Sequence, residues 1–258
     1  MKLIIFERVL THYRLKFYNY LIQNYNVEII FLTKEIPNNK GFKTNEKLAN
    51  FKILKLKNIE VFGFEFYAFP FSILKSDNVI VSLLSFKSLP NIFYAIFRLL
   101  IGKKFYFWGH SKNFSNSSYL ESFKNHIKGF STLFSTGVLA YTQKEKIRFQ
   151  SYGLSSNKII VLNNTINTDK ILKIVDSISK KEILNVEIKY KLKGKFVIGL
   201  IGRLHKLRNT EFAIKAILNL QHTYKNLVFL IIGEGEEYIN LKNKYSTYEN
   251  IIFVGAIE

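Results

Sequence analysis

The stretch KFVIGLIGRLHKLRN, residues 195–209, passes from an apolar run into a basic, polar segment. Two further apolar runs that end in glycine follow it, LVFLIIG at 227–233 and IIFVG at 251–255. Continuous apolar runs of this length are typical of parallel β-strands that are buried on both faces. Helix-like stretches lie between the runs, so this part of the chain predicts alternating strands and helices around a parallel sheet.

The same alternation fills the part of the chain that precedes this stretch. Seven further runs predict strands there, namely LIIF (3–6), VEIIFLT (27–33), FKILKLK (51–57), NVIVSLL (78–84), KFYFWG (104–109), GVLAYT (137–142) and KIIVLNN (158–164). Helices are expected at residues 13–23, 89–100, 117–134, 144–152, 209–223 and 236–245. Strands that alternate with helices predict a parallel sheet covered by helices on both faces.

A polar, lysine-rich segment at 177–195 separates the two series of strands. We therefore expect an N-terminal domain at 1–164, a linker with its flanking helix at 165–194 and a C-terminal domain at 195–258. The C-terminal domain has three predicted strands, whereas sheets average about five to six. The expected fold class is α/β with two Rossmann-like, parallel-sheet domains, the second of which is expected to be incomplete.

Composition narrows the possible functions. The 258 residues are 48% hydrophobic, enough for a sizeable core, and the lack of cysteine excludes a disulfide scaffold, a thiolate metal site and a cysteine nucleophile. The net charge is +19, of which residues 1–170 carry +14. The stretch VFGFEFYAFPF (61–71) adds exposed-looking aromatic residues, and the sequence contains no nucleic-acid motif. We therefore expect contact with an anionic membrane surface and no nucleic-acid partner.

The expected location is cytoplasmic, peripheral at the inner face of the membrane. The N-terminus has only four apolar residues in a row before Glu7, too few for a signal-peptide core. The most apolar region, 79–102, is interrupted by Lys87, Pro90 and Arg98, and a spanning helix needs about 20 mostly apolar residues. A buried strand followed by a helix is the favoured interpretation of this region.

Two loops at predicted strand ends carry candidate phosphate-binding residues. Gly202 and Arg203 lie where the strand at 195–202 ends, and Arg208 follows in the same loop. Free backbone N–H groups at a helix N-terminus suit a phosphate, and arginine side chains match its oxygens. An ordinary basic loop in front of a helix is the alternative interpretation.

Gly233, Glu234 and Gly235 form the second loop, after the strand at 227–233. The glycines permit a tight turn and a close approach of the backbone to a ligand. Open α/β sheets bind their ligands at the carboxyl ends of the strands, which favours a ligand-facing turn here. The adjacent Glu236 and Glu237 fit a helix N-terminus equally well as simple capping residues.

The expected N-terminal domain contributes three candidates. His110 follows the strand at 104–109, where it can form a hydrogen bond or transfer a proton, although a lone histidine is ordinarily structural. Tyr13 and Arg14 occupy the loop after the first strand, again on the carboxyl side of the sheet. A plain position on a helix face is an equal alternative for Arg14. Metal-ligand spacing is absent, so we expect neither a metal ion nor a cofactor.

These segments together resemble glycosyltransferases of the GT-B fold, in particular family 4 (glycosyl transferases group 1). GRLHKLRN resembles the family segment G-R-L-x-x-x-K-G, with Arg203 at its arginine, Arg208 at its lysine and Asn209 at its second glycine. IIGEGEEYINLK resembles V-G-x-G-P-E-x-x-x-L. FWGHSKN and THYRLKFYNYL resemble the W-G-H and H-Y-R-x-x-x-F segments of one subgroup.

The resemblance implies a retaining, metal-independent transferase that acts in the synthesis of cell-envelope glycans such as lipopolysaccharide. It implies a nucleoside-diphosphate sugar donor on the two loops of the C-terminal domain, a lipid-linked or polysaccharide acceptor near Tyr13 and Arg14, and contact between His110 and the donor sugar. The family's Glu-x7-Glu segment would lie beyond Glu258, so we expect a C-terminally truncated chain. A truncated, non-catalytic relic or binding module and a GT-B-fold sugar-nucleotide epimerase are the alternatives.

Overall fold

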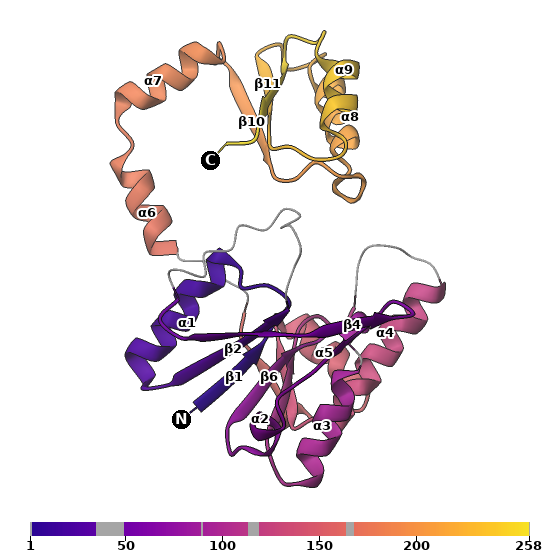
Figure 1. Ribbon diagram of the computed structural model, residues 1–258. Coiled ribbons are helices and arrows are strands. Elements are labelled where there is room, and N and C mark those ends of the chain that lie inside the picture. The colour runs from indigo at the N-terminus through magenta and orange to yellow at the C-terminus, as the bar shows by residue number, and fades with distance from the viewer. Residues whose placement is uncertain (1, 35–48, 89, 113–118, 164–167, 258) are drawn as a thin grey trace. The chain divides into compact units, whose positions relative to one another are not determined.

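The computed structural model describes residues 2–34, 49–88, 90–112, 119–163 and 168–257. It divides into two compact units, a first unit of residues Met1–Thr168 and a second unit of residues Asp169–Glu258 (Figure 1). The boundary expected between 164 and 165 lies outside the described residues. Each unit contains a sheet of parallel strands, and the expected α/β class is confirmed.

The first unit is built on a seven-stranded parallel sheet in the order β3-β2-β1-β6-β7-β8-β9. β1 lies in its interior, with Ile4 opposite Ile30 of β2 on one side and opposite Ile80 of β6 on the other. The strand order therefore reverses between β1 and β6, and the carboxyl edge of a sheet at such a point is where α/β proteins bind ligands. The strands are β1 (Lys2–Phe6), β2 (Glu28–Lys34), β3 (Lys52–Leu56), β6 (Val79–Leu83), β7 (Phe105–Trp108), β8 (Gly137–Ala140) and β9 (Ile159–Val161).

Helices cover both faces of this sheet because successive residues of a strand point to opposite sides. Ile5 of β1 packs in a core with Leu15 and Tyr18 of α1 (His12–Tyr25), whereas Ile4 and Phe6 pack in a second core on the other face. α2 (Phe71–Lys75), α3 (Asn91–Leu100) and α5 (Gln143–Ser151) contribute to the second core. Figure 1 shows α1 on one side of the sheet and α3 on the other; α4 (Tyr119–Ser131) precedes β8.

A β-hairpin follows β3 where the sequence suggested an exposed aromatic stretch. β4 (Asn58–Val61) and β5 (Phe64–Tyr67) pair antiparallel. Phe62 at the turn is 98% exposed, but Tyr67 is 2% exposed and both it and Phe69 pack edge-on against Phe6. The expectation of an exposed aromatic face at 61–71 is therefore wrong for part of the stretch, because Tyr67 at the end of β5 and Phe69 just after it point into the core.

Arg98 is a fully buried cation inside the first unit. It lies on α3 with 0% of its surface exposed, and its guanidinium donates hydrogen bonds to the carbonyls of Leu74 (2.8 Å), Ser76 (2.7 Å) and Lys104 (3.0 Å), and a short one to Asn78. Burial lowers the pKa of Arg98. One side chain thereby donates to carbonyls in the last turn of α2, in the segment between α2 and β6, and at the residue before β7.

The second unit has a three-stranded parallel sheet in the order β10-β11-β12. Its strands are β10 (Phe196–Ile201), β11 (Leu227–Ile232) and β12 (Ile251–Gly255), and its connecting helices are α8 (Thr210–Leu220) and α9 (Tyr238–Tyr245). Ile214, Ile231 and Leu241 form the centre of its core. The segment expected as a linker contains α6 (Thr168–Ser177) and α7 (Lys180–Lys189). No helix in the described part of the chain is both long enough and apolar enough to cross a bilayer.

Candidate active site

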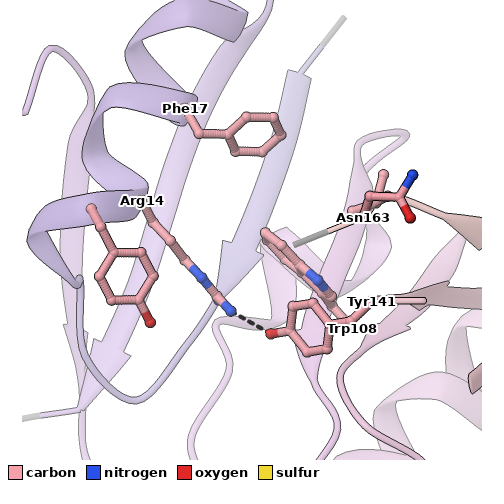
Figure 2. A pocket seen from close by; sticks show the side chains of 7 residues that line it. Arg14, Phe17, Trp108, Tyr141 and Asn163 are labelled. Atoms are coloured by element: carbon pink, nitrogen blue, oxygen red, sulfur yellow. Dashed lines mark hydrogen bonds between the residues drawn. The ribbon is translucent and has the colours of Figure 1, made fainter. Parts of the chain in front are cut away.

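A cavity of about 110 Å³ opens at the carboxyl edge of the first unit's sheet (Figure 2). α1 contributes Arg14 and Phe17, the end of β7 contributes Trp108, and Tyr141 and Asn163 follow β8 and β9. Tyr13 and Leu162 complete the lining. Tyr13 and Arg14, which the sequence placed on the acceptor side, both line this cavity from the first turn of α1. Sequence reasoning missed Trp108 and Tyr141, although an aromatic residue at each of two neighbouring strand ends was a usable signal.

Arg14 is held in place before any ligand arrives. Its guanidinium donates short hydrogen bonds to the Glu7 carboxylate and the Tyr141 hydroxyl, and it lies 4.3 Å from the centre of the Trp108 ring. Figure 2 shows Arg14 pointing across the cavity toward Tyr141. Burial opposes the charged form of Arg14, but Glu7 outweighs it and raises the Arg14 pKa.

Glu7 balances this charge from within the core. Its carboxylate is buried and also accepts a 2.8 Å hydrogen bond from the Tyr18 hydroxyl. Burial raises the pKa of Glu7, while Arg14 acts in the opposite direction. Because Arg14 and Glu7 are paired, the cavity presents aromatic faces and a compensated guanidinium rather than a free positive charge.

His110 lies beside this cavity. It follows β7, its side chain is 53% exposed, and its ring packs against Tyr141 with 4.4 Å between the ring centres. Tyr141 therefore contacts both Arg14 and His110. The position of His110 after the strand agrees with the sequence, and its catalytic role stays a prediction.

A buried carboxylate faces His110 from α5. The Nδ1 atom of His110 lies 3.7 Å from Oε1 of Glu145, and Oε2 accepts a 2.6 Å hydrogen bond from the backbone N–H of Ser111. Burial raises the pKa of Glu145, but His110 and Ser111 outweigh this effect and lower the pKa to about 2. The sequence analysis did not single out Glu145.

The two loops of the second unit are in backbone contact with each other. Gly233 has a φ of +137°, and a Cβ atom there would overlap the carbonyl oxygen of Gly202. A Cβ atom at Gly235 would overlap the carbonyl oxygen of Leu204, whose N–H donates a 2.9 Å hydrogen bond to the carbonyl of Glu234. The contact between the two loops therefore explains why glycine stands at positions 233 and 235. Their role toward a ligand stays a prediction.

Arg203 and Arg208 belong to the same loop between β10 and α8, and both side chains are exposed. Arg208 ends a single 3₁₀ turn at Lys206–Arg208. Asn209 follows with a φ of 50°, in the left-handed region that glycine and asparagine tolerate best. This conformation explains how Asn209 can stand where the resembling family has glycine. Within the described residues, no group of three or more His, Asp or Glu side chains is arranged to hold a metal ion.

No protein-family profile matches the chain. Two curated relatives from Methanocaldococcus jannaschii, named as the uncharacterized glycosyltransferases MJ1069 and MJ1059, are 25% and 26% identical to it over 94% and 87% of its length. The chain spans 64% and 56% of the lengths of these two relatives.

Several crystal structures share the fold over the whole chain. HepE of Anabaena, solved in complex with UDP, matches with a TM-score of 0.64 at 12% identity, and the match covers 70% of that protein. The lipopolysaccharide outer core galactosyltransferase WaaB matches with a TM-score of 0.60 at 14% identity over 69% of its chain. The UDP-GlcNAc 2-epimerase of Neisseria meningitidis, bound to UDP-GlcNAc, matches with 0.55 at 13% identity over 73% of its chain.

The GT-B fold and the resemblance to GT-B glycosyltransferases, both predicted from the sequence, are thereby confirmed. The finer assignment to family 4 stays a prediction.

Proposed function

We propose that the protein is a retaining, metal-independent glycosyltransferase that moves a sugar from a nucleoside-diphosphate sugar to an acceptor on the first unit. The observation that carries the proposal is the placement of Arg203, Arg208 and the 233–235 glycine loop at the carboxyl ends of neighbouring parallel strands. Backbone N–H donors fixed there can stabilise a departing diphosphate without reorganising during the reaction, and the two arginines add positive charge. Similarity to two proteins named glycosyltransferases supports the same class of reaction.

The aromatic cavity is the proposed acceptor subsite. Its volume of about 110 Å³ is smaller than the roughly 150 Å³ of an engineered apolar cavity that holds benzene, so we expect it to receive one edge or face of a sugar ring while the rest of the ring stays outside. Trp108, Tyr141 and Phe17 offer apolar faces, and the few polar groups can fix orientation. Because Glu7 already compensates Arg14, the cavity favours a neutral sugar ring of a lipid-linked or polysaccharide acceptor over a phosphate group.

The proposed setting is the synthesis of cell-envelope glycans at the inner face of the membrane. The +14 charge of residues 1–170 supports it, as do the exposed Phe17, Tyr20 and Tyr25 of α1. Vesicles that contain anionic lipid should therefore bind the protein and release it as salt rises, because exposed charges are screened beyond about 8 Å at physiological ionic strength. Equal binding to neutral vesicles would contradict the membrane assignment.

A second candidate is a sugar-nucleotide epimerase, because the Neisseria UDP-GlcNAc 2-epimerase shares the fold. One experiment separates the alternatives. The protein is incubated with a panel of nucleoside-diphosphate sugars and with neutral glycoside acceptors. A transferase produces free nucleoside diphosphate together with a glycosylated acceptor, whereas an epimerase produces a new sugar that is still linked to its nucleotide. Donor binding without either product supports a non-catalytic binding module, and absence of donor binding overturns the proposal.

The acceptor subsite has its own readout. The chain contains one tryptophan, Trp108, which lines the cavity. Titration with neutral methyl glycosides should change its fluorescence, whereas inorganic phosphate should not. Phe17→Ala should weaken the glycoside effect, and Phe212→Ala, at an exposed position of the second unit, is the matched control.

A further inference from the structure

Where all four of its residues are described, the sequence Ser/Thr-x-x-Glu begins two helices, and the two use the glutamate differently. At α7, Ser179 accepts a 3.2 Å hydrogen bond from the N–H of Glu182, and the Glu182 carboxylate accepts a 2.8 Å bond from the N–H of Ser179. This reciprocal arrangement is the capping box that the pattern predicts. The glutamate of α7 is therefore fully explained by helix capping.

At α5 the first half of the same motif forms, but the carboxylate turns elsewhere. Thr142 accepts a 3.2 Å hydrogen bond from the N–H of Glu145. The Glu145 carboxylate instead accepts a bond from the N–H of Ser111, 34 residues away in the chain, and faces His110. Helix capping therefore does not explain where this side chain points.

The surroundings keep Glu145 ionised and fixed. It is 4% exposed, and Arg148 lies 3.3 Å from its Oε1 atom. Lys128, buried on α4, adds a second positive group, whose pKa burial lowers to about 8 although Glu145 acts in the opposite direction. The His110 ring is confined between this carboxylate and the Tyr141 ring, while half of its surface stays open.

We infer that Glu145 is a positioning residue, which holds the His110 imidazole with its Nδ1–H toward the carboxylate and its Nε2 atom outward as a hydrogen-bond acceptor. A carboxylate that faces one ring nitrogen of a histidine sets the tautomer and so the chemistry of the other nitrogen. The inference rests on the proposed function in one respect: the group that Nε2 receives is a hydroxyl of a sugar substrate. Nε2 of His110 then accepts a hydrogen bond from this hydroxyl and does not donate one.

Tautomers can be read without any substrate. In the full chain labelled with ¹⁵N-histidine, long-range proton–nitrogen NMR at a pH where the ring is neutral distinguishes Nδ1–H from Nε2–H, and loss of one signal set in His110→Gln assigns it. We expect Nδ1–H in the native protein. Glu145→Gln keeps an acceptor for Ser111 but offers His110 an amide donor, so the ring should change to Nε2–H. Arg148→Met, which removes a neighbour of the same carboxylate, should leave the tautomer unchanged.

A native Nε2–H ring, or a tautomer that does not respond to Glu145→Gln while Trp108 fluorescence reports a folded first unit, would overturn the inference. The transferase turnover rate of His110 variants provides a second test. The terminal amide of glutamine can take the place of Nε2, whereas that of asparagine takes the place of Nδ1. His110→Gln should therefore keep most of kcat. In His110→Asn, kcat should fall roughly ten-fold or more, which corresponds to the loss of one hydrogen bond. An Nδ1–H tautomer in a protein with no transferase activity would refute the proposed function and leave the positioning intact.

Discussion

Replacing Arg98 should destabilise the first unit far more than its distance from the site suggests. In Arg98→Met the side chain becomes shorter and donates no hydrogen bond. The carbonyls of Leu74, Ser76 and Asn78 lose this donor. The carbonyl of Lys104 keeps the 3.2 Å hydrogen bond that it accepts from the N–H of Ile80. A buried group left without a partner costs about 1–3 kcal/mol. If water reaches one of these three carbonyls, the other two give a loss of about 4 kcal/mol in the free energy of unfolding.

Urea unfolding followed by tryptophan fluorescence measures this directly, because the single tryptophan, Trp108, reports on the first unit alone. With a denaturant slope of about 2 kcal/mol per M, the midpoint should fall by about 2 M. Arg98→Lys keeps a charge and three donors, so its midpoint should lie between those of the native protein and Arg98→Met. Lys103→Met, which removes a neighbouring, partly exposed cation that is paired with Asp77, is the control. A midpoint in Arg98→Met that equals that of the control would refute the reasoning.

Three further predictions concern the two sites. Gly235→Ala should separate the contacting loops and weaken nucleoside-diphosphate binding at least ten-fold in a calorimetric titration. The control Gly199→Ala, whose Cβ meets no atom within 4 Å, should bind normally. Equal affinities of the two variants would show that the loop contact does not matter. Arg203→Ala should lower kcat/KM for the donor about ten- to a hundred-fold, because a hydrogen bond to a charged group contributes about 1.5–3 kcal/mol. Arg208→Lys should lower kcat/KM less. Unchanged donor kinetics in Arg203→Ala would contradict the assignment. The Glu145 pKa of about 2 in the folded protein lies below its unfolded value of about 4.3, so ionised Glu145 stabilises the fold fully above pH 4.3. This stabilisation is lost as the pH falls toward 2. The difference in the free energy of unfolding between the native protein and Glu145→Gln should therefore narrow from pH 6 to pH 3. A gap that does not vary with pH would exclude this linkage.

The sequence predicted the strand and helix order well because the apolar runs are long and uninterrupted. All ten strands predicted from such runs are present among the described residues, with ends that differ by at most three positions. The hairpin of β4 and β5 was missed because each strand has only four residues, too few for a clear alternation. Its aromatic residues all lie in the turn and in β5 and read as one aromatic stretch.

The candidate residues that the sequence analysis singled out all lie in the connection, or in the first helical turn, that follows a predicted strand. His110, Arg203 and the glycines have that position, and so they could be singled out from the sequence. Glu7 also follows a strand, β1, but its sequence position does not show that its carboxylate is buried and paired with Arg14. Glu145 could not be singled out because its partners are more than 30 residues away in the chain, and a sequence of the form Thr-x-x-Glu looks the same whether its carboxylate caps a helix or faces an imidazole.

The backbone contact between the loops that follow β10 and β11 has a consequence for binding entropy. Where Gly202 meets Gly233 and Leu204 meets Gly235, peptide groups touch directly and no rotatable side chain intervenes. The N–H groups of Gly202, Leu204 and Gly233 donate to protein carbonyls, and this holds the main chain of both loops in place before a ligand arrives. Ordering one flexible side chain on binding costs about 0.5–1.5 kcal/mol. A ligand that binds to the main chain of these loops does not incur this entropy cost. Only the exposed side chains of Arg203 and Arg208 would have to be ordered on binding.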